Sequence, residues 1–162
     1  MRTIYLVRHA KSSWADPGMA DFDRPLNERG LRDAPVMAER FLERNEPVDL
    51  LVSSPAARAL ATARCFANVL GIERIVEVER IYEAHQKALR GVLEELPDEA
   101  RHVMLFGHNP GFTVLAEELS GERIGDLPTC AIVRIDLMAD RWREVSAGTG
   151  TLVWADAPKD DR

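Results

Sequence analysis

The residues Thr3-Ile-Tyr-Leu-Val7 form a short run of apolar and β-branched side chains, and the polar pair Arg8-His9 follows directly. Such a run is typical of a strand buried on both faces of a sheet. The pattern returns at residues 48–52, 74–78 and 102–106, where the sequence reads VDLLV, RIVEV and HVMLF. These stretches predict further strands of the same sheet.

Stretches with helical periodicity and helix start signals lie between and after these strands. Asn27 is expected to cap a helix over residues 27–44, in which apolar side chains recur along one side. Ser54 is expected to cap a second helix, with Pro55 as its first residue. A third helix is expected over residues 87–96, and Asn109-Pro110 repeats the combination of cap and proline for a fourth.

Strands that alternate with helices indicate right-handed crossovers and a mostly parallel sheet covered on both faces. We therefore predict an α/β fold, a three-layer α/β/α sandwich. Residues 131–137, 141–146 and 151–153 are interpreted as strands joined by turns that add antiparallel edge strands. One domain is expected over residues 1–154, with a polar C-terminal tail over residues 155–162.

The composition limits the classes of partner. With 27 acidic and 21 basic side chains the net charge is −6, which argues against nucleic acid, so an anion site must be a local concentration of Arg and His. No apolar run approaches the roughly 18 residues that span a bilayer. The N-terminus has no signal-peptide pattern, so we expect no membrane partner and a cytoplasmic location. Cys65 and Cys130 are expected to be buried thiols, and no CxxC pair indicates zinc.

Chemically informative side chains follow the predicted strands at the edge where such folds bind ligands. The first strand ends in Arg8-His9, and the second is followed by Arg58, one turn into the next helix. Glu83 follows the third strand and His108 the fourth. Two Arg, two His and one carboxylate should therefore converge beside two helix N-termini, which attract anions.

This set of groups suits a phosphoryl group. Arginine forks match the oxygens that carry charge during phosphoryl transfer, and a neutral histidine can attack phosphorus to give a covalent intermediate. Nearby arginines are expected to lower the pKa of His9. Its other ring nitrogen needs a fixed acceptor, for which a backbone carbonyl after the first strand is the candidate.

Each element also has an ordinary structural interpretation. Ser-Pro commonly begins a helix, a histidine in a glycine-rich turn is often only a polar residue, and a single glutamate is usually solvated. The coincidence of all of them at one sheet edge favours a site. We interpret His85 and His102 as structural. Trp14, Trp142 and Trp154 are assigned to core or lid packing rather than to base stacking.

Five sequence blocks, in this order, carry a family resemblance. They are LVRHAKSSW (6–14), DRPLNERG (23–30), SSPAARALATA (53–63), IYEA (81–84) and FGHNPG (106–111). Together they resemble the histidine phosphatase superfamily, the phosphoglycerate mutase-like proteins, in its branch of SixA-type phosphohistidine phosphatases. Most of that superfamily has Gly after the nucleophile, whereas this chain has Ala10, which the branch tolerates.

The resemblance implies a role for each matching residue. His9 would be the nucleophile, Arg8 and Arg58 would bind the phosphoryl oxygens, and His108 would complete a positive pocket. Glu83 falls where phosphoglycerate mutases keep their proton donor. Lys11, Ser12 and Ser13 are expected at the rim. The resemblance implies no cofactor, and no carboxylate cluster indicates a metal.

The resemblance implies a substrate class as well, namely phosphohistidine on a protein. The leaving group would then be imidazole, whose conjugate acid has a pKa of about 6.5, so that water or a weak acid suffices as proton donor. The short chain also lacks an insertion that would build a lid. A phosphatase for small phosphorylated metabolites and a non-catalytic phosphate-binding module remain alternatives, while mutase activity, which needs a lid, is less favoured.

Overall fold

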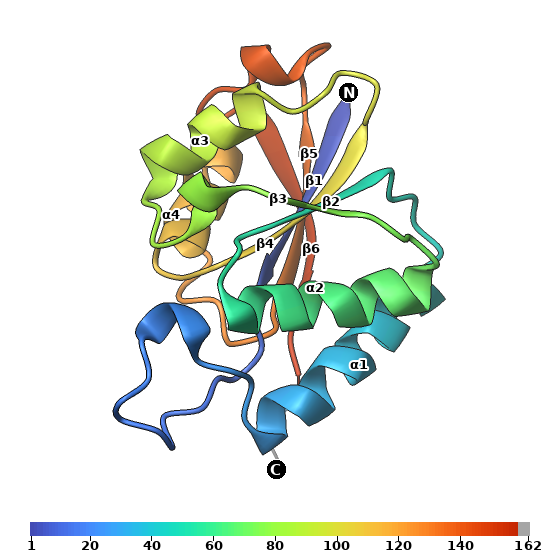
Figure 1. Cartoon of the computed structure of the whole chain (residues 1–162). Helices are drawn as coiled ribbons and strands as arrows, with labels where there is room; N and C mark the ends of the chain where they lie inside the picture. The colour runs from blue at the N-terminus through green and yellow to red at the C-terminus, as the bar shows by residue number, and fades with distance from the viewer. Residues whose placement is uncertain (159–162) are drawn as a thin grey trace.

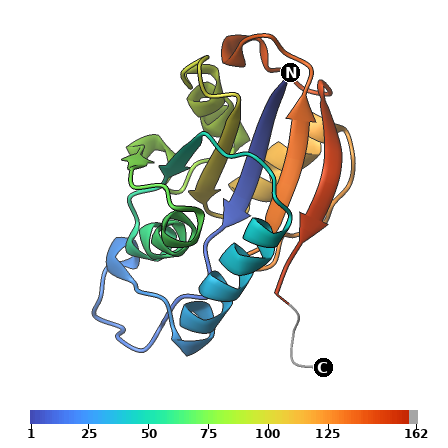
Figure 2. The ribbon, with the colours of Figure 1, turned by 90° about the vertical axis from the view of Figure 1, so that its right-hand side faces the viewer.

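The computed structural model describes residues 1–158 and contains a six-stranded sheet with the order β3-β2-β4-β1-β5-β6. The strands are β1 (Arg2–Arg8), β2 (Leu50–Ser53), β3 (Ile75–Glu77), β4 (His102–Gly107), β5 (Ile132–Leu137) and β6 (Gly150–Asp156). The first four are parallel, whereas β5 pairs antiparallel with β1 and β6 antiparallel with β5. The predicted parallel sheet with antiparallel edge strands is confirmed, and Figure 2 shows both antiparallel strands at one edge.

The helices form two layers, one on each face of the sheet (Figure 1). They are α1 (Glu28–Glu43), α2 (Ala57–Leu70), α3 (Gln86–Glu94) and α4 (Gly111–Ser120). One hydrophobic core, which includes Phe41 and Phe66, lies between the sheet and α1 and α2. The other, which includes Leu89 and Phe112, lies under α3 and α4. The predicted three-layer sandwich is therefore confirmed. Among the residues described, no helix has the length and apolarity to cross a membrane.

The starts of α1 and α2 compare differently with the predicted caps. Asn27 caps α1 as predicted, because its side chain accepts a hydrogen bond from the backbone N–H of Gly30. Ser54 was wrongly assigned as the cap of α2, since the N-cap position is Ala56 and the helix begins at Ala57. The Ser54 hydroxyl accepts a hydrogen bond from the backbone N–H of Ala56, at the N-cap position itself, and also lies 2.8 Å from a ring nitrogen of His108.

The expectation of a strand over residues 141–146 was wrong. Trp142 to Glu144 forms a short 3₁₀ helix, η3, because the fully buried Trp142 anchors this segment. Its indole N–H donates to the carbonyl of Ala100 at 2.7 Å, and its backbone N–H to Asp98 at 3.0 Å. Strand β5 consequently pairs directly with β6.

The C-terminal boundary also differs from expectation. Strand β6 continues through Ala155 to Asp156, which pairs with Ile132, so the ordered sheet extends two residues beyond the boundary expected at residue 154. Of the predicted polar tail, residues 159–162 lie outside the described residues.

The sheet register brings the candidate residues to one edge. Arg8 pairs with Gly107 and Ser53 with Phe106, so β1, β2 and β4 end at nearly the same level. Gly107 is needed there because a Cβ atom would lie 2.5 Å from the ring of Phe112. The loop over residues 10–26, which contains the 3₁₀ helix η1 (Asp21–Asp23), projects from this edge beside the start of α2 (Figure 1).

Candidate active site

His9 follows β1 and is buried, with one ring nitrogen fixed by the backbone. Its Nδ1 lies 2.7 Å from the carbonyl oxygen of Ala10, so Nδ1–H is the donor and Nε2 keeps its lone pair. The Ala10 peptide is itself held, because its N–H donates to the hydroxyl of Thr62 on α2 at 3.0 Å. The expected backbone acceptor in the loop after the first strand is confirmed.

Both burial and neighbouring charge keep His9 neutral. Burial is the larger cause and, with repulsion by Arg58, Arg8 and Arg24, it lowers the pKa of His9 to about 4 despite the bond to Ala10. The lowering was predicted from the arginines alone, whereas burial makes the larger contribution. At neutral pH the ring therefore carries one proton, on Nδ1, and offers Nε2 as a nucleophile.

Arg58, in the first turn of α2, is buried against His9. Its Nε lies 3.4 Å from Nε2 of His9. Its two terminal nitrogens donate to Asp21, Nη1 to the backbone carbonyl at 2.7 Å and Nη2 to Oδ2 at 3.0 Å. Arg8 is oriented by a 2.7 Å bond to the carbonyl of Leu127, and burial lowers its pKa.

His108 faces His9 across the site. The ring centroids are 5.2 Å apart, and the Nε2 of His108 lies 2.8 Å from the hydroxyl oxygen of Ser54. Burial, followed by the proximity of His9 and Arg58, lowers the pKa of His108 to about 3. At neutral pH this ring is therefore neutral and can contribute hydrogen bonds to the site.

Asp21 is a residue of the site that sequence reasoning missed. Its carboxylate accepts hydrogen bonds from Tyr82 at 2.6 Å and from Arg24 and Arg58 at 3.0 Å. The bond from Tyr82 contributes most, and with those from the two arginines it lowers the pKa of Asp21 to about 2. Asp21 lies in an irregular loop, where no periodicity or strand end marks a residue, and its position beside the Asp23-Arg24 block was the only available signal.

The site opens into a cavity of about 220 Å³. Its lining comprises Arg8, His9, Lys11, Ser12, Trp14, Arg24, Arg58, His108, Asn109 and Thr129. Four of the predicted site residues, Arg8, His9, Arg58 and His108, thus lie together, with Lys11 and Ser12 beside them. Among the described residues, no group of three His, Cys, Asp or Glu side chains is arranged to hold a metal ion.

Glu83 is not brought into this cavity. Its side chain is exposed and its backbone has a φ of 54°. The phenol of the neighbouring Tyr82 has a raised pKa, caused first by burial and then by hydrogen bonds to Asp21 and Glu83. The sequence placed Glu83 correctly at the sheet edge, but this left-handed backbone turn could not be read from residue types.

Trp14 differs from its assignment to core or lid packing. It is 74% exposed at the cavity rim, and the guanidinium carbon of Arg24 lies 3.5 Å from the ring centroid. Trp142 is buried as expected, and Trp154 packs against Tyr5 and Phe41.

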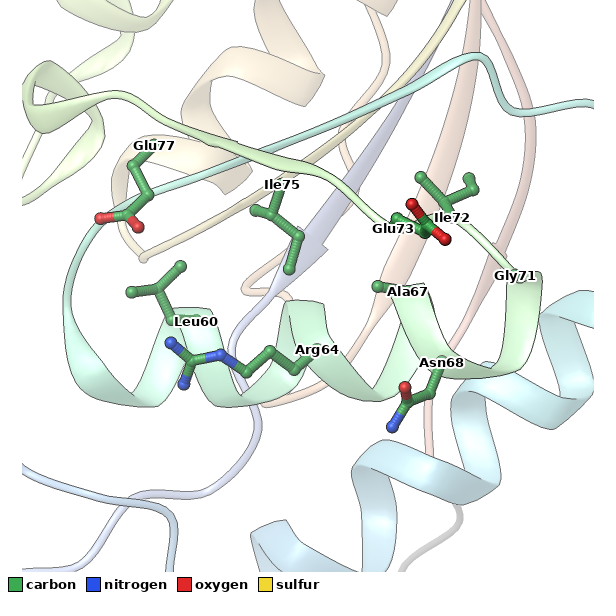
Figure 3. A pocket seen from close by; sticks show the side chains of 9 residues that line it. All are labelled: Leu60, Arg64, Ala67, Asn68, Gly71, Ile72, Glu73, Ile75 and Glu77. Atoms are coloured by element: carbon green, nitrogen blue, oxygen red, sulfur yellow. The ribbon is translucent and has the colours of Figure 1, made fainter.

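A larger hollow of about 560 Å³ lies between α2 and β3 (Figure 3). Its lining includes Arg64, Glu73 and Glu77, but no histidine. With one arginine between two carboxylates it does not offer the concentrated positive charge that an anion requires. The smaller cavity at His9 is therefore the candidate site.

Comparison with known families agrees with this geometry. The family model of the histidine phosphatase superfamily (branch 1) matches residues 4–127. The chain belongs to the histidine phosphatase superfamily. As a histidine phosphatase superfamily member, it is an enzyme of the phosphatase or mutase type.

The chain is also similar to individual proteins and to solved structures. The uncharacterized protein Rv1276c of Mycobacterium tuberculosis is 34% identical, with 94% of this chain and 100% of the relative covered. A crystal structure from Agrobacterium tumefaciens, provisionally assigned as the phosphohistidine phosphatase SixA, is 31% identical with a TM-score of 0.83, covering 98% and 99% of the two chains. A shorter match, 36% identical over 85 residues (51% of this chain, 40% of the relative), is to a protein provisionally named phosphoserine phosphatase 2 from Hydrogenobacter thermophilus.

Proposed function

We propose that this protein is a metal-independent phosphatase that removes the phosphoryl group from phosphohistidine on a protein, through an intermediate phosphorylated on His9. The observation that carries this proposal is the composition of the cavity wall. In the described part of the chain, the lining supplies cations, two neutral histidines and neutral polar groups, but no carboxyl group. Such a site suits a substrate whose leaving group needs no strong acid.

In the first step, Nε2 of His9 attacks phosphorus in line with the bond to the leaving nitrogen. The new Nε2–P bond forms as the old N–P bond breaks, and the electron pair of the old bond stays on the leaving nitrogen. Because the other ring nitrogen of the substrate histidine is protonated beforehand, the group that leaves is neutral imidazole. The hydrogen bond from Nδ1 to Ala10 stabilises the cationic ring of the phosphorylated His9. Arg8 and Arg58 bind the phosphoryl oxygens.

In the second step, water attacks phosphorus and the Nε2–P bond breaks. Its electron pair returns to His9, the water proton passes to solvent and inorganic phosphate departs. The first step uses the neutral ring that burial maintains, since a ring protonated on both nitrogens has no lone pair to attack with.

The acidities around the cavity support the choice of leaving group. Asp21 and His108, with pKa values of about 2 and about 3, are deprotonated at neutral pH, and Tyr82 has a raised pKa. None of these groups is matched to donating a proton near pH 7. A substrate histidine that is protonated on its other ring nitrogen departs as neutral imidazole, whose conjugate acid has a pKa of about 6.5, and needs no positioned acid, whereas a serine alkoxide requires one.

The surface around the cavity supports a protein substrate. Trp14, Met19 and Phe22, all in the loop over residues 10–26, are exposed large apolar side chains. Lys11 in the same loop is exposed and basic. A small phosphorylated metabolite would leave this rim uncovered, whereas a protein that presents a phosphohistidine would bury it.

The proposal is tested by comparing kcat/KM for a phosphohistidine protein, a phosphoserine peptide and common sugar phosphates. We expect the phosphohistidine protein to be preferred. Preference for phosphoserine, the alternative that the similarity to phosphoserine phosphatase 2 favours, would overturn the substrate assignment. Phosphate binding without turnover on any substrate would indicate a binding module.

Trp14→Ala tests the rim separately. It is expected to raise KM for the phosphohistidine protein several-fold and to leave the rate on a small aryl phosphate nearly unchanged. Met138→Ala is the matched control, because Met138 is 72% exposed but follows β5 at the opposite end of the sheet. Equal effects of the two substitutions would contradict docking of the substrate at Trp14.

A further inference from the structure

The hydroxyl of Ser54 lies between a helix start and the second histidine of the site. Ser54 is fully buried directly after β2. Its Oγ accepts a hydrogen bond from the backbone N–H of Ala56 at 3.2 Å and lies 2.8 Å from Nε2 of His108. A hydroxyl has one proton and two lone pairs. Since Ala56 occupies one lone pair, His108 is the one remaining partner for the proton among the described residues.

His108 has a matching incompleteness. Its Nδ1 is buried and, within residues 1–158, has no hydrogen-bond partner. The ring lines the cavity, and its centroid lies 5.2 Å from that of His9. A phosphoryl group carried on His9 would therefore lie beside this ring.

A neutral His108 can carry its single proton in two ways. If the proton is on Nε2, this nitrogen donates to Ser54, whose own proton then has no acceptor. The lone pair of Nδ1 then has no hydrogen-bond donor, and it repels a phosphoryl oxygen. If the proton is on Nδ1, Ser54 donates to Nε2 and Nδ1–H is free to donate to the anion. Only the second arrangement gives every donor an acceptor once a phosphoryl group is bound.

We propose that Ser54 is a positioning residue that holds His108 as the Nδ1–H tautomer, so that Nδ1–H donates to an oxygen of the transferring phosphoryl group. The identity of that acceptor rests on the proposed function, whereas the tautomer does not. In this arrangement Ser54 acts through His108 and does not itself touch the substrate. It also accounts for a serine that begins no helix although a proline follows it.

The tautomer is measured directly by ¹⁵N NMR of the wild-type protein with labelled histidine side chains. We expect the His108 Nδ1 resonance to be that of a protonated nitrogen and Nε2 that of a nitrogen with a lone pair. Inorganic phosphate should shift the Nδ1–H proton downfield and slow its exchange with water. A His108 protonated on Nε2, or an Nδ1–H that does not respond to saturating phosphate, would overturn the proposal.

Kinetics of substituted proteins provide the second test. Ser54→Ala is expected to lower kcat on an aryl phosphate by about 10- to 100-fold with a smaller change in KM, and to allow the Nε2–H tautomer. Ser54→Thr, which keeps the hydroxyl, should restore most of the rate. Ser53→Ala is the matched control, because Ser53 is equally buried but its hydroxyl donates to the Ser54 carbonyl at 2.8 Å.

The outcomes separate this proposal from the proposed function. An unchanged tautomer in Ser54→Ala, or equal losses in Ser53→Ala and Ser54→Ala, would contradict the role of Ser54 even if the protein is an active phosphatase. The predicted tautomer and its response to phosphate in a protein without turnover would instead remove the enzymatic function. If Ser54→Ala fails to fold, the wild-type NMR measurement decides alone.

Discussion

Two neutral histidines buried in a cationic pocket should make the folded protein sensitive to mild acid. In the unfolded chain His9 takes up a proton as the pH falls through about 6.5, whereas in the folded protein its pKa is about 4. Between these values the unfolded state binds more protons, so the free energy of unfolding decreases as the pH falls. The difference corresponds to about 3 kcal/mol from His9 by pH 4, with a further loss from His108.

The measurement is urea unfolding at pH 7 and at pH 4. His9→Gln, which cannot titrate, should lose about 3 kcal/mol less than the wild type over this interval. His85→Gln is the control, because His85 is exposed. Asp21 and Asp49 have lowered pKa values, so their contribution is lost mainly below their ordinary pKa of 3.8 and interferes little in this window. Equal losses in the wild type and His9→Gln would refute the reasoning.

Four further predictions concern activity. His9→Ala should abolish turnover of an aryl phosphate and leave no acid-labile phosphoenzyme in a rapid-quench experiment, and full residual hydrolysis would remove the mechanism. Asp21→Asn should lower kcat by about 10-fold, because the side-chain bond that helps to aim Arg58 Nε at His9 weakens, and an unchanged kcat would assign Asp21 no positioning role. Glu83→Gln should leave the rate on phosphohistidine nearly unchanged, and a large loss would show that Glu83 is a proton donor. A chelator should also leave the rate nearly unchanged, and a large loss would show that the enzyme needs a metal.

The sequence predicted what depends on periodicity and on strand ends. Arg8 ends β1 and His108 follows β4, and parallel topology alone brings such residues to one edge. The sequence could not predict contacts made by an irregular loop, which is why Asp21 was missed. The sequence also could not show whether a buried serine caps its own helix or binds a distant histidine. Ser54 was assigned as a helix cap, but it is not at the N-cap position of α2.

The anchoring of Trp142 shows a different limit. Residues 141–146 have the composition of a strand, but the indole N–H needs an acceptor when the ring is buried, and Ala100 supplies it 42 positions away. A tertiary hydrogen bond of this kind overrides local strand propensity, and the pattern of a single sequence cannot predict it.

The link from the Ala10 peptide to Thr62 on α2 has a mechanical consequence. The carbonyl that orients the ring of His9 belongs to the same residue whose N–H is tied to the helix that carries Arg58. Nucleophile and guanidinium thus share one rigid frame and would move together if α2 shifts. Asp21 is bonded to Arg58 and belongs to that frame, whereas residues 14–19 lie before it in the loop. Exchanging residues 14–19 for a sequence of another shape should therefore redirect the choice of substrate while the reacting atoms keep their spacing.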